Sequence, residues 1–396
     1  MALNTALVLS GGGARGAYEA GVLKYIRGEL PPRIQARVHF DIFCGTSVGA
    51  VNCCFLATLN HMPQIQGEAL AEMWKSLRID GMYQIGLREI LNLPKFLFGS
   101  RGRGELDEVV GPNRLGGLFN TSPMERLMHR AVRWHQIGAN LQSGDLKSIA
   151  VAATHVAEGN THVFLQRAST EKLVWGSDRQ IVPYEVVLGP QHALASAAIP
   201  WVFPAVEIEG EIYCDGGIKL NTPIAPAVTL GAERIFLVSL RTDALSRTKK
   251  KERIDRYPSA LFLLGKVLNA LMVDKTDYDL ERLERFNVLA GLWDSEVADK
   301  MKAFRGEPYR QIDNFVIRPS EDIGLIAGKR LRTGGLPERV GGIMGWFLDR
   351  MAKSVDDEGA DVLSYFLFDA EYANDLIELG MHDADAQRQK LIEFFS

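Results

Sequence analysis

The chain has 396 residues and a formal net charge of −4; 46% of its residues are hydrophobic and 24% are charged. This is the composition of an ordinary globular protein, long enough for one large domain or two smaller ones. The slightly acidic balance argues against a nucleic-acid partner, because nucleic-acid binding usually requires a basic face.

The cysteines and the N-terminus set further limits. None of the four cysteines (Cys44, Cys53, Cys54 and Cys214) forms a C-x-x-C pair, which argues against a zinc site and a disulfide framework. Reduced thiols fit a cytoplasmic protein. Residues 1–10 place no Lys or Arg before their short apolar run, so we expect no signal peptide. We also expect no transmembrane helix, because no run of about 20 apolar residues exists; peripheral contact with a membrane stays open.

The first sixty residues predict strand, glycine loop, helix, strand, tight turn and helix. Residues 6–9 are a short apolar run typical of a buried parallel strand. Apolar residues then recur at helical spacing over 17–29, where Pro31 and Pro32 follow. A second strand is expected at 40–44 and a buried helix at 50–59.

Further along the chain, helical patterns separate most of the expected strands. These strands are at 148–156, 162–167, 212–214, 235–240 and 314–317. The alternation predicts an α/β fold with a largely parallel central sheet flanked by helices. Additional C-terminal helices are expected over 260–288 and 342–395, and the charged stretch 242–256 is predicted to be an exposed loop.

The first motif is the glycine loop Gly11-Gly12-Gly13-Ala-Arg15-Gly16. Its G-x-G-x-x-G spacing also occurs in dinucleotide-binding folds, but these need an acid at the end of the second strand. Here the nearest acid, Asp41, stands at the beginning of the next strand. The loop therefore favours an oxyanion site, where backbone N–H groups and a helix N-terminus face a negative charge.

The second motif is Gly45-Thr-Ser47-Val-Gly49, between an apolar strand and an apolar helix. Flanking glycines let a strand turn sharply into a helix, which lifts the serine hydroxyl out of the chain. The context predicts that Ser47 is a nucleophile.

The third motif is Asp215-Gly216-Gly217, at the end of the expected strand 212–214. Alone, such a sequence is more often a turn than a site. Beside the other two motifs, it predicts that Asp215 is a catalytic partner, with two glycines that leave room for another side chain.

These motifs, in this order, resemble the patatin-like phospholipases, whose pattern is a glycine-rich oxyanion loop with an arginine, then G-x-S-x-G, then D-G-A/G. The likeness extends over nearly the whole chain. Further similar stretches are residues 117–123, 195–204, 220–224, 365–372 and 376–380.

The resemblance implies hydrolysis of lipid acyl esters by a Ser47–Asp215 dyad, through an acyl-serine intermediate and with neither metal nor cofactor. The matching oxyanion positions are Gly11, Gly12, Gly13, Arg15 and Gly16. A patatin-like catalytic domain is expected at 1–245, and a helix-rich remainder with one strand near 314–317 is expected at 246–396, packed on the same core. The substrate would be a phospholipid, lysophospholipid or glyceride at a membrane or micelle surface.

Several alternatives stay open at this point. A Ser–Asp–His triad with His382 is formally possible, although that histidine lies in an expected C-terminal helix. The same acyl-serine could serve an acyltransferase, and a protein with a silent site could be a lipid-binding regulator. The apolar stretch 87–98 is either a lid or an ordinary core helix, and 242–256 is either a lipid contact or a solvated loop.

Overall fold

The computed structural model describes most of the chain. The described residues are 3–82, 114–115, 120–175, 180–200, 202–242, 276–292, 296–297, 299–300, 311–333, 335–341, 345 and 361–396. The expected lid or core helix at 87–98 lies outside them, and so does the charged stretch 242–256 apart from Thr242.

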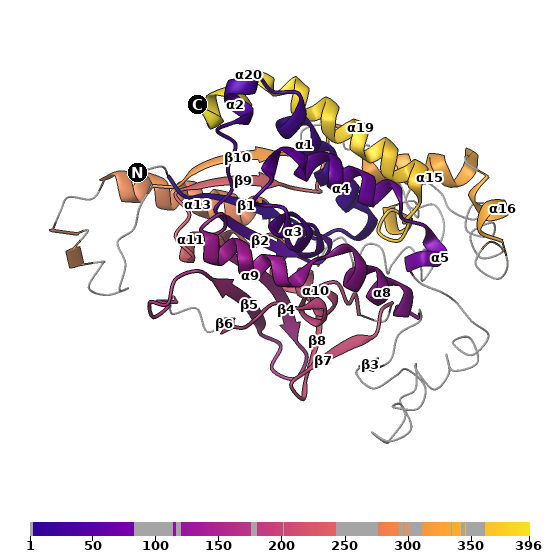
Figure 1. Ribbon diagram of the computed structural model, residues 1–396, viewed down its shortest axis with the longest axis horizontal. Helices are drawn as coiled ribbons and strands as arrows, with labels where there is room; N and C mark the ends of the chain where they lie inside the picture. The colour runs from indigo at the N-terminus through magenta and orange to yellow at the C-terminus, as the bar shows by residue number, and fades with distance from the viewer. Residues whose placement is uncertain are drawn as a thin grey trace, which may run out of the picture.

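The centre of the molecule is a sheet with the strand order β10-β9-β1-β2-β4-β8-β7-β3 (Figure 1). Its first five strands in this order are mutually parallel. They are β10 (Asp313–Ile317), β9 (Arg234–Val238), β1 (Thr5–Leu9), β2 (Ile42–Thr46) and β4 (Ser148–His155). The expected largely parallel sheet is therefore confirmed.

The remaining strands extend this sheet beyond β4 in mixed directions. Strand β5 pairs with β4 antiparallel and with β6 parallel, whereas β8 runs antiparallel to both β4 and β7. These strands are β5 (Thr161–Arg167), β6 (Ile181–Glu185), β7 (Ala205–Ile208), β8 (Glu211–Asp215) and the short β3 (Arg114–Leu115).

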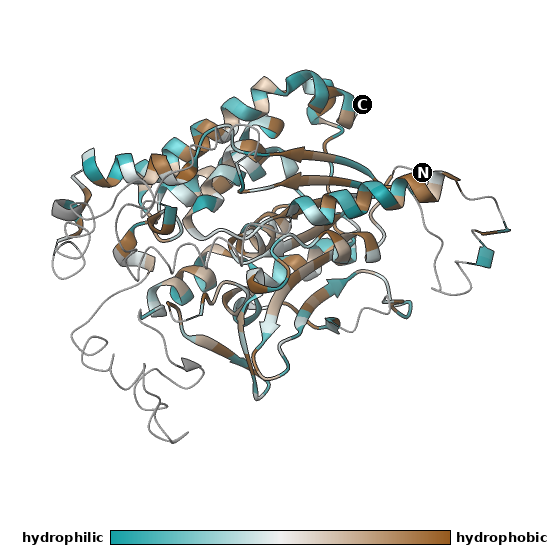
Figure 2. Ribbon diagram, turned by 180° about the vertical axis from the view of Figure 1, so that it is seen from behind, coloured by the Kyte–Doolittle hydropathy of each residue, from teal (hydrophilic) through white to brown (hydrophobic). Residues whose placement is uncertain are grey.

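Both faces of the parallel strands are buried, which explains their continuous apolar runs. On β1, Leu7 and Leu9 face a large hydrophobic cluster, and Ala6 and Val8 face a smaller one. Figure 2 shows hydrophobic residues in brown along the central strands. The alternation fixes the register, since a shift by one residue would exchange the two faces.

Helices cover the two faces unequally. The larger cluster joins the sheet to α1 (Ala17–Gly28), α3 (Val48–Thr58), α4 (Gln66–Lys75) and α19 (Ala370–Ala386). The opposite face is covered by α11 (Ile224–Thr229) and α13 (Thr276–Leu292). The other described helices are α2 (Pro32–Gln35), α5 (Ile79–Met82), α8 (Ser122–Ala131), α9 (Trp134–Ser143), α10 (Pro190–Ser196), α15 (Ile323–Thr333), α16 (Leu336–Val340) and α20 (Arg388–Phe395). No helix within these described ranges is long and apolar enough to cross a membrane.

The two ends of the chain meet in one helix pair. Helix α19 lies along α1 (Figure 1), and glycines bring their backbones together. A Cβ on Gly21 would lie 2.1 Å from the carbonyl oxygen of Ile377, and one on Gly380 would lie 2.4 Å from that of Tyr18. Helix α19 therefore packs directly on α1, the helix that follows the glycine loop. The division of the chain at residue 245 stays a prediction.

Most expected elements are present with shifted ends. The second strand was expected at 40–44 but spans Ile42–Thr46. Asp41 directly precedes the strand: its N–H donates to the Thr5 carbonyl and its carboxylate accepts the Thr5 N–H, both at 2.9 Å. The strand continues through Gly45 into the turn. The helix expected at 260–288 is described only from Thr276 onward, and the strand expected at 314–317 is β10.

Candidate active site

Ser47 stands in a sharp turn between β2 and α3. Its backbone has φ 54° and ψ −126°, in the left-handed half of conformational space that non-glycine residues rarely adopt. Its amide N–H donates to Ser196 Oγ at 2.8 Å, which helps to hold this turn. The strain is local and lies at the predicted nucleophile.

The glycines on either side of Ser47 are required by close backbone contacts. A Cβ on Gly45 would lie 2.3 Å from the Gly49 carbonyl oxygen, and one on Gly49 would lie 2.3 Å from that of Leu9. Any larger residue would push α3 away from β1 and β2. The G-x-S-x-G pattern thus reflects the packing of this strand–turn–helix unit.

Strand β4 brings Asp215 to Ser47. Thr46, the last residue of β2, pairs with Ala152 of β4, and Asp215, the last residue of β8, pairs with the next residue, Ala153. Strand β8 runs opposite to β2, so the two strands end facing each other along one edge of β4. Residues far apart in sequence therefore meet in contact.

The resulting pair is short and buried. Ser47 Oγ donates to Asp215 Oδ2 at 2.7 Å, and Asp215 Oδ1 accepts the Gly217 N–H at 2.7 Å. Asp215 is 0% and Ser47 1% exposed. Burial raises the pKa of Asp215 from 3.8 to about 7, against the opposing effect of these two hydrogen bonds. A carboxylate with such a pKa suits proton transfer near neutral pH better than an ordinary aspartate does.

Two neighbouring residues, Ser196 and Thr154, support the pair, and the sequence analysis did not single them out. Ser196 accepts the Ser47 N–H and donates its own hydroxyl to the Ala152 carbonyl at 2.5 Å. Thr154 Oγ1 donates to the backbone carbonyl of Asp215 at 2.9 Å. Both tie the dyad residues to β4. No local pattern signals these roles, because each depends on the pairing of strands.

The glycine loop lies against the nucleophile turn. A Cβ on Gly11 would approach Ser47 Cβ to 3.0 Å, and one on Gly13 (φ 58°) would lie 2.2 Å from the Tyr365 carbonyl oxygen. The N–H of Gly11 donates to the Asn221 carbonyl at 3.1 Å and that of Ala14 to the Tyr365 carbonyl at 2.9 Å.

Within the described part of the chain, the N–H groups of Gly12 and Gly13 have no acceptor. These two amides are available to a bound anion. Gly16 instead packs beside Val48 and Trp74.

Arg15 is buried and points toward the C-terminal part of the chain. Its Nε donates to Ser364 Oγ at 2.7 Å, and its Nη2 contacts the side chain of Asp361 at 2.5 Å and the carbonyl of that residue at 2.9 Å. The guanidinium also lies over the Tyr365 ring, 3.9 Å from its centroid. This geometry favours a role for Arg15 in bracing the loop over a role as a positive charge that faces the oxyanion.

An apolar cavity opens beside Ser47. Its empty volume is about 690 Å³, including the open mouth. Val48, Val51 and Phe55 form one wall along α3, and Met73, Met82, Met124 and Met128 contribute flexible side chains. The remaining lining residues are Gly13, Ser47, Trp74, Leu77, Leu127, Ala131, Val132, Leu194, Ala197, Ile199, Phe203 and Phe368. Such a wall suits a hydrocarbon chain attached to a group at Ser47.

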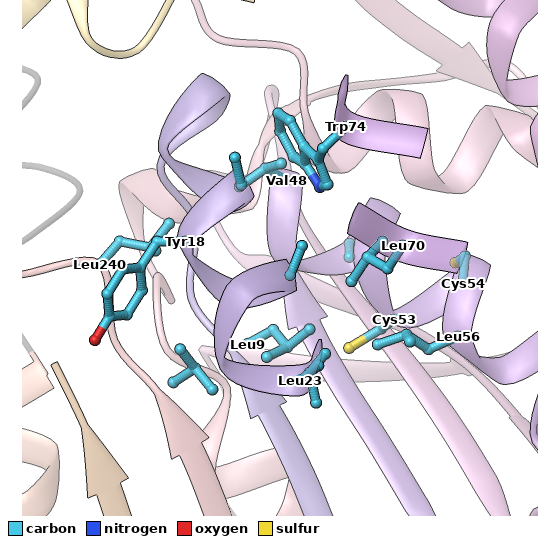
Figure 3. Close-up of a cluster of buried hydrophobic side chains, with 14 of the residues drawn as sticks. Leu9, Tyr18, Leu23, Val48, Cys53, Cys54, Leu56, Leu70, Trp74 and Leu240 are labelled. Carbon is cyan, nitrogen blue, oxygen red and sulfur yellow. The ribbon is translucent and has the colours of Figure 1, made fainter. Parts of the chain in front are cut away.

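The packing behind this cavity is dense. Figure 3 shows Val48 next to Trp74, and Leu9, Leu23 and Cys53 gathered where β1, α1 and α3 meet. Burial raises the pKa of the thiols of Cys44, Cys53 and Cys54, so these cysteines resemble small apolar side chains more than nucleophiles.

Neither a Ser–Asp–His triad nor a ribose-binding acid of the dinucleotide-binding kind is formed by the described residues. None of the eight histidines, all of which are described, hydrogen-bonds to Ser47 or Asp215. The side chain of His382 is 74% exposed on α19 and lies beside Asp383. Asp41 binds the Thr5 N–H and Lys147, at the end of the strands away from the glycine loop.

The sequence analysis missed a cluster of three polar side chains, because it judged metal binding by cysteine spacing alone. His155, Glu158 and His162 have ligand atoms within 4.8 Å of one another. Their signal is an H-x-x-E-x-x-x-H spacing across the turn between β4 and β5.

A comparison with protein-family models agrees with the motifs. The family model described as patatin-like phospholipase matches residues 7–228. A cGAMP-activated phospholipase of Pseudomonas aeruginosa (strain BWHPSA011 / Pa011) is 29% identical over 219 residues, which is 55% of this chain and 53% of that protein. The chain thus matches about half the length of this curated relative. The crystal structure of VipD from Legionella pneumophila aligns with 95% of this chain and 67% of that chain, at 12% identity and a TM-score of 0.30.

Proposed function

Because this chain belongs to the patatin-like phospholipase family, we propose that it hydrolyses carboxylic esters of lipids, with Ser47 as nucleophile and Asp215 as base. The observation that carries the proposal is the 2.7 Å hydrogen bond from Ser47 Oγ to Asp215 Oδ2 beside an apolar cavity. A serine hydroxyl needs a neighbour that takes its proton, and Asp215 is the neighbour in contact.

In the first step, the Asp215 carboxylate takes the proton as Ser47 Oγ attacks the ester carbonyl carbon. The tetrahedral intermediate then collapses, and the alcohol of the lipid leaves with that proton. In the second step, water attacks the acyl-serine and gives its proton to Asp215, which returns it to Ser47 as the fatty acid departs. Since the pKa of Asp215 is raised to about 7, the group can both accept and release a proton near neutral pH.

The negative charge of the intermediate would be held by the N–H groups of Gly12 and Gly13. Both amides lack an acceptor within the described residues, and Gly13 lines the same cavity as Ser47. Gly11 would act as a close neighbour of Ser47, because its own N–H is bonded to Asn221. Arg15 would position the loop from behind.

The acyl chain would lie along α3. Phe55 follows Ser47 by eight positions, which corresponds to about 12 Å along the helix. A chain in this cavity is surrounded by carbon and thioether groups, so the substrate would be a phospholipid, lysophospholipid or glyceride at a membrane or micelle surface.

The test uses two assays on the same protein. A fluorophosphonate probe should label the wild type and fail to label Ser47→Ala. Mixed phosphatidylcholine and phosphatidylglycerol vesicles should release free fatty acid, measured by mass spectrometry, with wild type but not with Ser47→Ala or Asp215→Asn. Added glycerol would reveal transfer to an alcohol in place of water. Labelling of a residue other than Ser47, or lipolysis by Ser47→Ala, would refute the assignment.

A further inference from the structure

The turn between β4 and β5 holds three side chains that converge. Glu158 Oε2 lies 3.9 Å from His155 Nδ1 and 3.5 Å from His162 Nε2. Both histidines are buried, at 3% and 2% exposure, whereas the side chain of Glu158 is 55% exposed. One exposed carboxylate therefore stands at the solvent side of two buried imidazoles.

In each imidazole, the ring nitrogen that faces away from Glu158 contacts a residue of β8. His155 Nε2 lies 2.9 Å from Glu211 Oε2, and His162 Nδ1 lies 3.1 Å from the Tyr213 hydroxyl. When His155 donates from Nε2 to Glu211, the lone pair is on Nδ1, the atom that faces Glu158. Carboxylates in this position orient metal-binding histidines in many proteins.

The other ring nitrogen of His162, which faces Glu158, lacks a hydrogen bond among the described residues. His162 Nε2 is fully buried and makes no hydrogen bond in the described structure. Glu158 Oε2 faces this nitrogen at 3.5 Å without a hydrogen bond, and an ion held between the two atoms would satisfy both of them.

We propose that His155, Glu158 and His162 bind one divalent transition-metal ion, with Zn²⁺ the best match. The ligands would be His155 Nδ1, His162 Nε2 and a Glu158 oxygen, and a water would complete a tetrahedron. Two imidazoles and one carboxylate form a ligand set typical of Zn²⁺, whereas Ca²⁺ and Mg²⁺ prefer oxygen alone.

Binding requires a small contraction of the cluster. Zinc bonds of about 2.0–2.1 Å in a tetrahedron place ligand atoms roughly 3.4 Å apart. The imidazoles lie parallel with centroids 4.6 Å apart, so one ring must tilt toward the other. His155 Nδ1 must also give up the Glu158 backbone N–H, which it accepts at 3.2 Å. The exposed Glu158 side chain supplies the remaining movement.

Such an ion would cross-link β4 to β5 across their turn, and both histidines contact β8, the strand that ends in Asp215. His155 pairs with Tyr213 in the ladder, two positions from the pairing of Ala153 with Asp215. The ion would therefore act on stability and would take no part in the chemistry at Ser47. An ion that binds only the folded state raises the free energy of unfolding in proportion to the logarithm of its concentration over the dissociation constant.

The experiment uses full-length protein without a histidine tag, treated with EDTA and passed through a metal-free column. Zinc chloride is titrated by calorimetry into wild type, Glu158→Gln, Glu211→Gln and Glu207→Gln. Glu207 is the matched control: it is an exposed carboxylate on the neighbouring β7, paired with Ile212 and therefore on the other face of the sheet from Glu211 and Tyr213. Ser47→Ala is a second control, for binding at the dyad.

We expect one equivalent of Zn²⁺ per chain in the wild type and both controls. Glu158→Gln should weaken the affinity at least about tenfold, and Glu211→Gln should weaken it about tenfold through the orientation of His155. A Co²⁺-loaded sample should lack the thiolate charge-transfer band that cysteine ligands would produce. No binding at micromolar zinc, affinity unchanged in Glu158→Gln, or a thiolate band would each overturn the proposal. These readouts do not depend on lipolysis, so they stand apart from the proposed activity.

Discussion

Strands β4 and β8 carry two polar clusters that differ in their access to water. Asp215 and Ser47 are almost fully buried, at 0% and 1% exposure, whereas the group of His155, Glu158 and His162 has a carboxylate at the surface. The two clusters lie only two ladder positions apart. The comparison shows how the same pair of strands can support opposite uses of charge: the enclosed carboxylate acquires a raised pKa, and the open one can move toward a ligand.

The largest effect is expected from changes inside the enclosed cluster. Ser47→Ala and Asp215→Asn should each lower kcat/KM for a soluble p-nitrophenyl ester at least about 10³-fold, because the nucleophile or its base is lost. His155→Ala and His382→Ala should retain activity in folded protein. A histidine variant as inactive as Ser47→Ala would restore the triad. Circular dichroism checks the folding of each variant.

Asp215→Asn should also stabilise the protein. The folded-state pKa of Asp215 is raised from 3.8 to about 7, so its ionised form costs free energy in the folded state. The cost is fully present above about pH 7 and vanishes below about pH 4, because the folded state then holds the proton that the unfolded state also holds. We expect a gain on the order of a few kcal/mol at pH 8 that shrinks at pH 5. Urea unfolding at both pH values measures it, and equal stability at pH 8 would contradict the burial argument.

The sequence pointed to Ser47 and Asp215 for a physical reason, and their catalytic roles stay a prediction. Gly45, Gly49 and Gly216 mark places where backbones approach too closely for a side chain, and Ser47 and Asp215 stand beside these glycines at the ends of β2 and β8. The resemblance to the family added the pairing of Ser47 with Asp215, and the family match confirms that resemblance.

What the sequence could not supply is contact between distant segments. Ser196 contacts Ser47 only because β4 positions both residues. Arg15 pairs with Asp361, which lies near the other end of the sequence. The second strand begins and ends two residues later than predicted, at Ile42 and Thr46, because its pairing with β4 continues through Gly45 into the turn. Pair contacts of this kind depend on register, which short motifs do not encode.

The next largest effect on activity is expected from Arg15, which positions the glycine loop beside the enclosed cluster. Arg15→Ala should lower kcat about 10²-fold in folded protein, the usual cost of a disturbed oxyanion site. The cause would be displacement of Gly12 and Gly13 when the bonds to Ser364 and Asp361 are lost. Arg15→Lys should not restore activity, since one ammonium cannot replace the two-sided guanidinium contact.

Arg330→Ala is the matched control for that variant. Arg330 also pairs with a C-terminal acid, Asp375, but on α15 and α19, away from the glycine loop. It should lose some thermal stability and keep its kcat. Full activity in Arg15→Ala would show that the loop needs no brace.

A smaller effect is expected from pH. The Asp215 carboxylate must be ionised to accept the serine proton, so kcat/KM should fall about tenfold per unit below a pKa of about 7 and level off above it. Burial lowers the pKa of His192 to about 4, so that histidine stays neutral over this range and cannot supply the step. The profile is measured with a fluorogenic ester, corrected for product ionisation. Glu158→Gln should leave the midpoint unchanged, and a midpoint near pH 4 would contradict a buried base.

The smallest effect on activity is expected from metal removal, and it separates the two clusters most cleanly. No residue of the dyad or of the glycine loop belongs to the His155 group, and the steps at Ser47 require only a proton carrier and two amides. EDTA treatment should therefore change the initial rate of ester hydrolysis at 25 °C by less than about twofold, while lowering the melting temperature by a few degrees for a loss of about 1–2 kcal/mol. Zinc should restore the melting temperature of the wild type and of Glu207→Gln but not that of Glu158→Gln. Hydrolysis abolished by EDTA and restored by zinc in wild type would show that the ion acts at the dyad, and the separation between the enclosed and the open cluster would then be wrong.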